Sequence, residues 1–91
     1  MTALLLAITG RVQGVGYRDW LVREAQRRGI QGWVRNRPDG SVQALVAGES
    51  EAVKAVVAAC HRGPLFARVS QVAESAHPPP EETGFTRMAD G

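Results

Sequence analysis

Gly14-Val15-Gly16-Tyr17-Arg18 lies between a run of residues typical of a β-strand and a run typical of an α-helix. Glycines at the start of a helix let several backbone N–H groups point at one spot, and the helix dipole favours an anion there. Arg18 adds a full positive charge, although a cation in the first turn opposes the dipole by about 0.3–1 kcal/mol. The stretch therefore predicts a phosphate-binding turn, in which the anion offsets the unfavourable position of the arginine. An ion pair of Arg18 with Asp19 or another nearby acid would explain the arginine equally well.

Hydrophobic periodicity divides the rest of the chain into strands and helices. Five runs are expected to be strands, the last of them short: Ala3–Val12, Gly32–Asn36, Ser41–Ala47, Ala67–Ala76 and Gly84–Met88. Two runs are expected to be helices: Arg18–Arg28, and a stretch that starts near Ser50 and stops at Gly63-Pro64. The turn Arg37-Pro38-Asp39-Gly40 joins the second and third strands, because proline presets φ and glycine accepts a positive φ.

The order of these elements is βαββαβ with a possible short fifth strand at the C-terminal end. This order predicts an α+β fold of the ferredoxin-like type, an antiparallel sheet with both helices on one face. We expect residues 1–91 to form a single domain whose tail, residues 89–91, is frayed. In this arrangement the first and third strands are central and the second lies beside the third, which would bring Asn36 towards the glycine turn.

Composition and charge narrow the class of protein. The chain is 44% hydrophobic, enough for a modest core, and its only cysteine, Cys60, excludes an internal disulfide and a cysteine-based zinc site. Cys60 continues an apolar helical stripe and is expected to be a core residue. The apolar run Ala3–Ile8 is too short to span a membrane and lacks the features of a signal peptide, so we expect a cytoplasmic protein. Residues 1–48 carry seven arginines against three acids, which favours an anionic ligand.

The usual catalytic groups are missing around the glycine turn. No histidine, paired carboxylates or metal-ligand spacing occurs there, and His61 and His77 are expected to be surface residues. The turn also lacks the Gly-Lys-Ser/Thr of a nucleotide P-loop, which makes ATP and NAD poor ligand candidates. Asn36 is a neutral amide that can hold a water through its donor and its acceptor, although local hydrogen bonding in the turn is an alternative role.

Two longer segments resemble the two signatures of the acylphosphatase family. Ile8–Arg18 resembles the first signature, and Gly32–Asn36 followed by Asp39–Val42 and Gly48 resembles the second. The resemblance runs from about Leu4 to Val72. The chain departs from the family near its end, where Arg87 stands in a series that is often aliphatic.

The resemblance implies a specific reaction. Acylphosphatases hydrolyse the carboxyl–phosphate mixed anhydride of acyl phosphates to a carboxylate and inorganic phosphate, without metal or cofactor. It also implies that Asn36 orients the attacking water and that Arg18 binds the phosphate with the backbone of the preceding loop, which consists of Gln13, Gly14, Val15, Gly16 and Tyr17. Because a carboxylate is a good leaving group, the reaction asks mainly for positioning and charge stabilisation. We expect a protein that acts on small acyl phosphates and is inhibited by phosphate, and by default we expect it to be a monomer.

Two other readings remain. A non-enzymatic RNA-binding module is compatible with a pI near 9.3 and a sheet fold, but aromatic residues make up only 5% of the chain and the aromatic sheet motif is absent, so we expect no nucleic-acid partner. An acylphosphatase-like domain that feeds carbamoyl phosphate chemistry in a larger maturation protein is the third reading. The sequence contains neither zinc-finger cysteines nor a second domain, which favours the single-domain enzyme.

Overall fold

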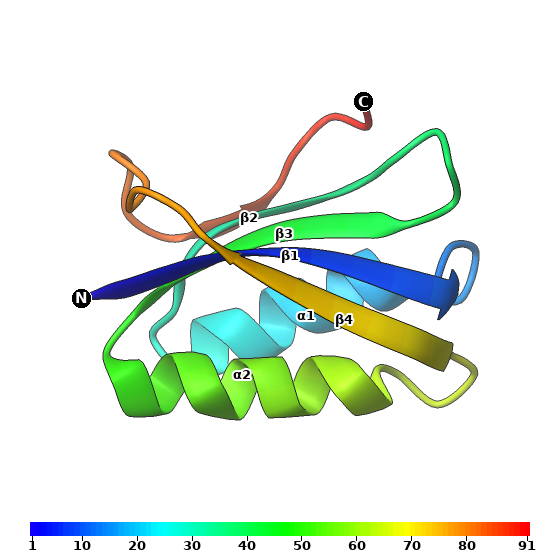
Figure 1. The fold of residues 1–91 in the computed structure, drawn as a ribbon, viewed down its shortest axis with the longest axis horizontal. Helices are drawn as coiled ribbons and strands as arrows, with labels where there is room; N and C mark the ends of the chain where they lie inside the picture. Colours follow the sequence, from blue (N-terminus) through cyan, green and yellow to red (C-terminus); the bar gives the residue numbers. More distant parts are fainter.

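The computed structural model describes all 91 residues, arranged as one five-stranded sheet and two helices. The elements are β1 (Thr2–Arg11), α1 (Tyr17–Arg27), β2 (Gln31–Asn36), β3 (Val42–Gly48), α2 (Ser50–Arg62), β4 (Arg68–Ala76) and β5 (Phe85–Arg87). The strands lie in the order β4-β1-β3-β2-β5, and both helices cover the same face of the sheet (Figure 1). The ferredoxin-like α+β fold predicted from the sequence is confirmed. Neither helix is long and apolar enough to cross a membrane.

The direction of the last strand corrects one detail of that prediction. β1 to β4 pair antiparallel as expected, but β5 pairs parallel with β2, so the sheet is mixed. The register aligns Gly32 with Phe85 and Val34 with Arg87. The direction follows from the connection over residues 77–84, which reverses the chain after β4 and carries it to the opposite edge of the sheet.

The C-terminal ends of β1 and β2 lie at the same end of the sheet. Both strands run antiparallel to β3, so they run in the same direction. Ile8 lies opposite Val42 on one side, and Asn36 lies opposite Val42 on the other. Asn36 therefore ends its strand beside the loop through which the chain leaves β1.

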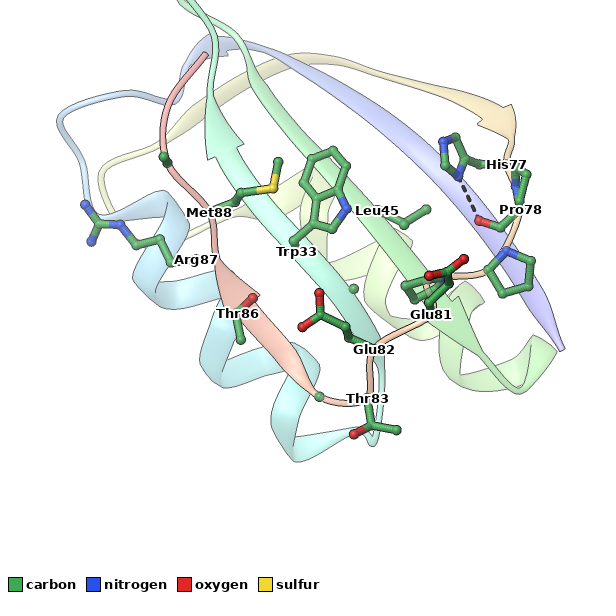
Figure 2. Close-up of a pocket in the computed structure, with 15 residues that line it drawn as sticks. Trp33, Leu45, His77, Pro78, Glu81, Glu82, Thr83, Thr86, Arg87 and Met88 are labelled. Atoms are coloured by element: carbon green, nitrogen blue, oxygen red, sulfur yellow. Dashed lines mark hydrogen bonds between the residues drawn. The ribbon is translucent and has the colours of Figure 1, made fainter.

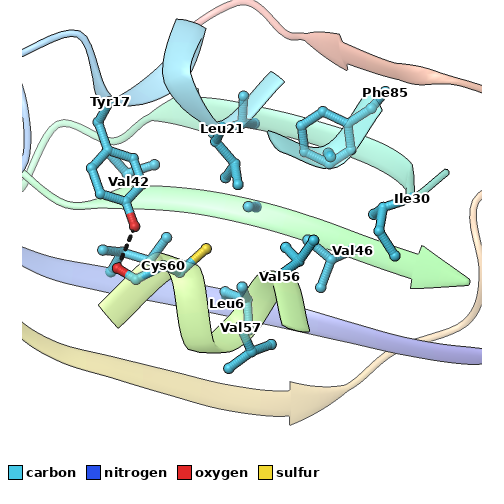
Figure 3. Packing of buried hydrophobic residues seen from close by; sticks show 14 of the residues in the cluster. Leu6, Tyr17, Leu21, Ile30, Val42, Val46, Val56, Val57, Cys60 and Phe85 are labelled. Atoms are coloured by element: carbon cyan, nitrogen blue, oxygen red, sulfur yellow. Dashed lines mark hydrogen bonds between the residues drawn. The ribbon is translucent and has the colours of Figure 1, made fainter. Parts of the chain in front are cut away.

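The hydrophobic core lies between the helices and the sheet (Figure 3). Leu6 and Val46 from the central strands meet Leu21 of α1 and Val56 of α2, all with no exposed surface. Phe85 is 2% exposed and joins the same core, so β5 is held in place by packing as well as by its pairing. Cys60 is fully buried there, as its place in the helical stripe predicts.

One buried hydrogen bond ties the start of α1 to the end of α2. Tyr17 Oη donates to the carbonyl oxygen of Cys60 at 2.6 Å (Figure 3). Cys60 has no helical donor four residues on, because Pro64 carries no N–H. Burial raises the pKa of the Tyr17 phenol far above its ordinary value, so the hydroxyl stays protonated and remains a donor.

Candidate active site

The loop between β1 and α1 presents a row of unpaired backbone donors. Gly14 and Gly16 have φ of 74° and 80°, which L side chains rarely adopt. Gly16 precedes α1 in a left-handed conformation, and no side chain caps the helix. The backbone N–H groups from Gly14 to Asp19 donate no hydrogen bond within the chain. The start of α1 therefore offers several free N–H groups to an anion.

A small cavity of about 70 Å³ opens at these donors. Its walls come from both sequence motifs and from β5, and consist of Val12, Gln13, Gly14, Gly16, Tyr17, Arg18, Asp19, Asn36 and Arg87. Of the predicted site residues only Val15 is missing from the lining, because its side chain packs against the core. The fold thus brings the glycine turn, Arg18 and Asn36 together around one cavity.

Arg18 is partly buried and already paired with a carboxylate. Its side chain is 24% exposed, and Nη1 lies 3.0 Å from Asp90 Oδ1 and 3.2 Å from Asp90 Oδ2. The neighbouring acid Asp19 pairs instead with Arg87, whose Nη1 lies 2.7 Å from Asp19 Oδ1. The sequence raised an ion pair of Arg18 with a nearby acid as an alternative, but the partner comes from the far end of the chain.

Asn36 carries an unsatisfied acceptor. Its side-chain oxygen Oδ1 is buried and accepts no hydrogen bond. Its backbone N–H donates to Asp90 Oδ1 at 3.0 Å, and its backbone carbonyl accepts from the N–H of Gly91 at 3.1 Å. A buried carbonyl oxygen without a donor is costly, so Oδ1 is an acceptor whose hydrogen-bond partner the chain itself does not supply.

The side chain of Gln13 has a role that the sequence did not reveal. Nε2 donates to the carbonyl oxygens of Arg37 and Ser41, at 2.8 and 2.9 Å. Within this hairpin, Asp39 Oδ1 accepts from the N–H and the hydroxyl of Ser41, which lowers the pKa of Asp39. Gln13 therefore braces the glycine turn against the β2–β3 hairpin, and only its backbone N–H is left to face an anion.

The largest cavity lies elsewhere and has a different character (Figure 2). It measures about 660 Å³ and lies on the face of the sheet away from the helices, between Trp33 and the 77–84 connection. Glu81 and Glu82 line it, and such an acidic lining is poorly suited to a phosphate. Arg87 stands at its rim but points away from it, towards α1 (Figure 2). Nowhere in the structure do three or more His, Cys, Asp or Glu side chains come together as a metal site.

Comparisons with known proteins extend over the whole fold. The acylphosphatase family model matches residues 4–87. An acylphosphatase of Acidiphilium cryptum is 50% identical over 91 residues, which are 100% of both chains. An acylphosphatase of Azorhizobium caulinodans is 53% identical over 83 residues, covering 90% of this chain and 89% of the relative. The crystal structure of acylphosphatase from Bacillus subtilis superposes with a TM-score of 0.91 at 34% identity, covering 97% of this chain and 99% of that one.

Proposed function

The chain belongs to the acylphosphatase family, enzymes that hydrolyse acyl phosphates, and from this premise we propose which of its residues carry out the reaction. Its substrates are small acyl phosphates, and inorganic phosphate is one product. The chemistry requires one group of residues to hold the phosphoryl group and another to direct a water at phosphorus. The two sequence motifs divide these tasks.

The backbone of Gln13 to Tyr17 and the guanidinium of Arg18 hold the phosphate. This assignment is supported most by the unpaired N–H groups that meet the Arg18 side chain around one small cavity. Preformed donors of this kind stabilise charge on the equatorial phosphate oxygens without reorganising during the reaction. An arginine adds charge-assisted hydrogen bonds, about twice as strong as neutral ones.

Asn36 orients the attacking water. No group of the chain donates a hydrogen bond to its Oδ1. In this role Oδ1 accepts a hydrogen bond from an O–H of the water, which orients a lone pair of the water oxygen towards phosphorus. The water oxygen forms the new bond to phosphorus while the bond from phosphorus to the carboxylate oxygen breaks. The carboxylate leaves with the electron pair and needs no general acid. The phosphate itself accepts the proton of the water.

Three further expectations accompany this mechanism, on the oligomeric state, the location in the cell and the effect of EDTA. We expect a monomer, because the proposed roles require no residue from a second copy of the chain. Cys60 is a buried free thiol, which suits the reducing cytoplasm. Charge stabilisation is assigned to Arg18 and to backbone N–H groups, so turnover of benzoyl phosphate is expected to be the same with and without EDTA.

Inhibition by the product tests the phosphate assignment. In the Arg18→Gln variant, inorganic phosphate should no longer inhibit the hydrolysis of benzoyl phosphate, and turnover should be lost or nearly lost. Arg23→Gln is the matched control, because Arg23 is exposed on the same helix and makes no ion pair with an acid of the chain. Phosphate inhibition of normal strength in Arg18→Gln would overturn the assignment.

A further inference from the structure

Residues 89–91 continue β5 along the edge of β2 and end at the candidate active site; we refer to them as the strap. The N–H of Met88 donates to the carbonyl oxygen of Val34 at 2.8 Å, and the N–H of Gly91 donates to that of Asn36 at 3.1 Å. Arg37 Nη1 also donates to the carbonyl oxygen of Gly91. In Figure 1 the strap is the red end of the chain, which runs towards the connection between β2 and β3.

The strap places a carboxylate on two residues of the proposed catalytic machinery. Asp90 Oδ1 accepts from Arg18 Nη1 and from the Asn36 N–H, both at 3.0 Å, and Oδ2 lies 3.2 Å from the same Arg18 nitrogen. Asp90 does not line the phosphate cavity itself. It lies in an adjoining groove of about 280 Å³, whose walls include Gln13 and Asn36, which the two cavities share.

A carboxylate in this position opposes the binding of phosphate in three ways. It occupies Arg18 Nη1, one of the donors that a phosphate oxygen would use, and it neutralises the only guanidinium assigned to the substrate. It also sets a negative charge beside the cavity that has to accept a phosphate bearing up to two negative charges, and like charges at such short range repel. Docking of Asp90 and binding of the phosphoryl group therefore exclude or weaken each other.

The strap is held by hydrogen bonds and one ion pair at the surface of the protein. Residues 89–91 are all exposed, and the Asp90 side chain is 51% exposed. Exposed ion pairs contribute little to stability, and a segment with few buried apolar contacts opens at small cost. The frayed tail that the sequence predicts would then be the open state of the same segment, in exchange with the docked state.

We propose that the strap is an autoinhibitory element in which the Asp90 carboxylate competes with the phosphoryl group for Arg18. This inference rests on the proposed roles of Arg18 and Asn36. Substrate binds only to molecules whose strap is open, so the apparent KM and the apparent inhibition constant of phosphate both rise as the open fraction falls. Saturating substrate displaces the strap completely, so kcat is unaffected.

The test is to remove the charge of Asp90 and measure two constants in parallel. Asp90→Asn keeps the shape of the side chain, and Asp90→Ala removes the acceptor altogether. If the strap is docked in most molecules, both variants should lower the KM for benzoyl phosphate and the inhibition constant of inorganic phosphate by the same factor, at least about twofold, with kcat unchanged. Glu82→Gln is the matched control: it removes one negative charge from the same end of the chain but lines only the larger cavity, and it should alter neither constant.

The outcomes separate this inference from the proposed function. Unchanged or raised values of KM and of the inhibition constant in both Asp90 variants would overturn the competition, and so would a fall in kcat. If Arg18→Gln still abolishes phosphate inhibition in that case, the assignment of Arg18 to the phosphate stands. An equal response to Glu82→Gln would also overturn it, because the effect would then be one of net charge. If phosphate does not inhibit the wild-type protein, the proposed function is wrong, and the competition, which rests on it, is wrong as well.

Discussion

Gln13 reaches across the candidate active site to Ser41, with its side-chain Nε2 2.9 Å from the Ser41 carbonyl oxygen. The same nitrogen lies 2.8 Å from the carbonyl oxygen of Arg37. One amide therefore joins the loop that presents the backbone donors to the hairpin that follows Asn36. In the proposed mechanism this bond fixes the distance between the bound phosphate and the water, because the two groups are carried by different segments.

Loss of this brace should impair catalysis more than folding. We expect Gln13→Leu to lower kcat/KM for benzoyl phosphate by about 10- to 100-fold, since small displacements of reacting groups are costly. The free energy of unfolding should fall by only about 1 kcal/mol, because both carbonyls keep a backbone donor, from Arg37 to Ser41 and from Gly40 to Arg37. Steady-state kinetics and urea unfolding measure the two effects. Gln71→Leu, an exposed position on β4, is the control, and a normal kcat/KM in Gln13→Leu would contradict the bracing role.

The backbone conformation of the glycine turn gives a second prediction. Gly16→Ala forces φ of +80° on an L residue, which costs about 1–2 kcal/mol, although the added methyl group meets no atom within 4 Å. Gly29→Ala imposes the same strain, φ of +69° in equally open space, at the far end of α1. Both variants should lose similar stability in urea unfolding. Only Gly16→Ala should weaken inhibition by phosphate, and equal inhibition constants would count against the turn as the phosphate site.

The hydrogen bond from Tyr17 to Cys60 should matter for stability and not for substrate. Tyr17→Phe leaves a buried carbonyl oxygen without a donor, so the free energy of unfolding should fall by about 1–3 kcal/mol. For a chain of this size, each 1 kcal/mol corresponds to a fall in Tm of about 4–8 °C. The inhibition constant of phosphate should stay within about twofold, because only the backbone of Tyr17 is assigned to the phosphate. Thr83→Val, which removes an exposed hydroxyl, is the control, and an unchanged Tm in Tyr17→Phe would refute this role.

Alkaline pH should destabilise the fold through Cys60 and Tyr17. Burial raises the pKa of the Cys60 thiol from its ordinary value of 9.0 to about 12, and burial raises that of Tyr17 as well. Above pH 9 the unfolded chain therefore loses protons that the folded chain keeps, and stability falls as pH rises, by up to about 1.4 kcal/mol per pH unit for one group. Urea midpoints between pH 7 and 10.5 measure this fall. Cys60→Ala should flatten the part that begins near pH 9, and a slope identical to wild type would contradict the assignment.

The local parts of the site could be predicted from the sequence. Gly14 and Gly16 have positive φ in the structure because they form the tight turn that their spacing indicated. Asn36 reaches the same cavity because the strand order of a βαββαβ chain sets β2 beside β3 and β3 beside β1. Both inferences depend on neighbouring residues or on the order of the elements, which periodicity reveals.

The contacts made by the end of the chain could not be predicted in this way. The pairs of Arg18 with Asp90 and of Asp19 with Arg87 join residues about 70 positions apart. They depend on the route of the 77–84 connection, which takes β5 to the edge beside β2 and in the parallel direction. No local pattern near Arg18 or Asp90 records that route. The hydrogen bonds from Gln13 to the hairpin do not depend on this route, but they too could not be predicted, because a glutamine beside a glycine turn has no periodic signal.

The division of labour between Arg18 and Asn36 is tested most directly by the steady-state kinetics of Asn36→Ala with benzoyl phosphate. The substitution removes the side-chain amide and keeps the backbone groups that pair with the strap. If Asn36 orients the water, kcat should fall by about 100-fold or more while KM stays within about threefold, because the lost interaction serves the transition state and not the bound substrate. A rise in KM with kcat largely retained would show that Asn36 binds the substrate, and the proposed mechanism would be wrong.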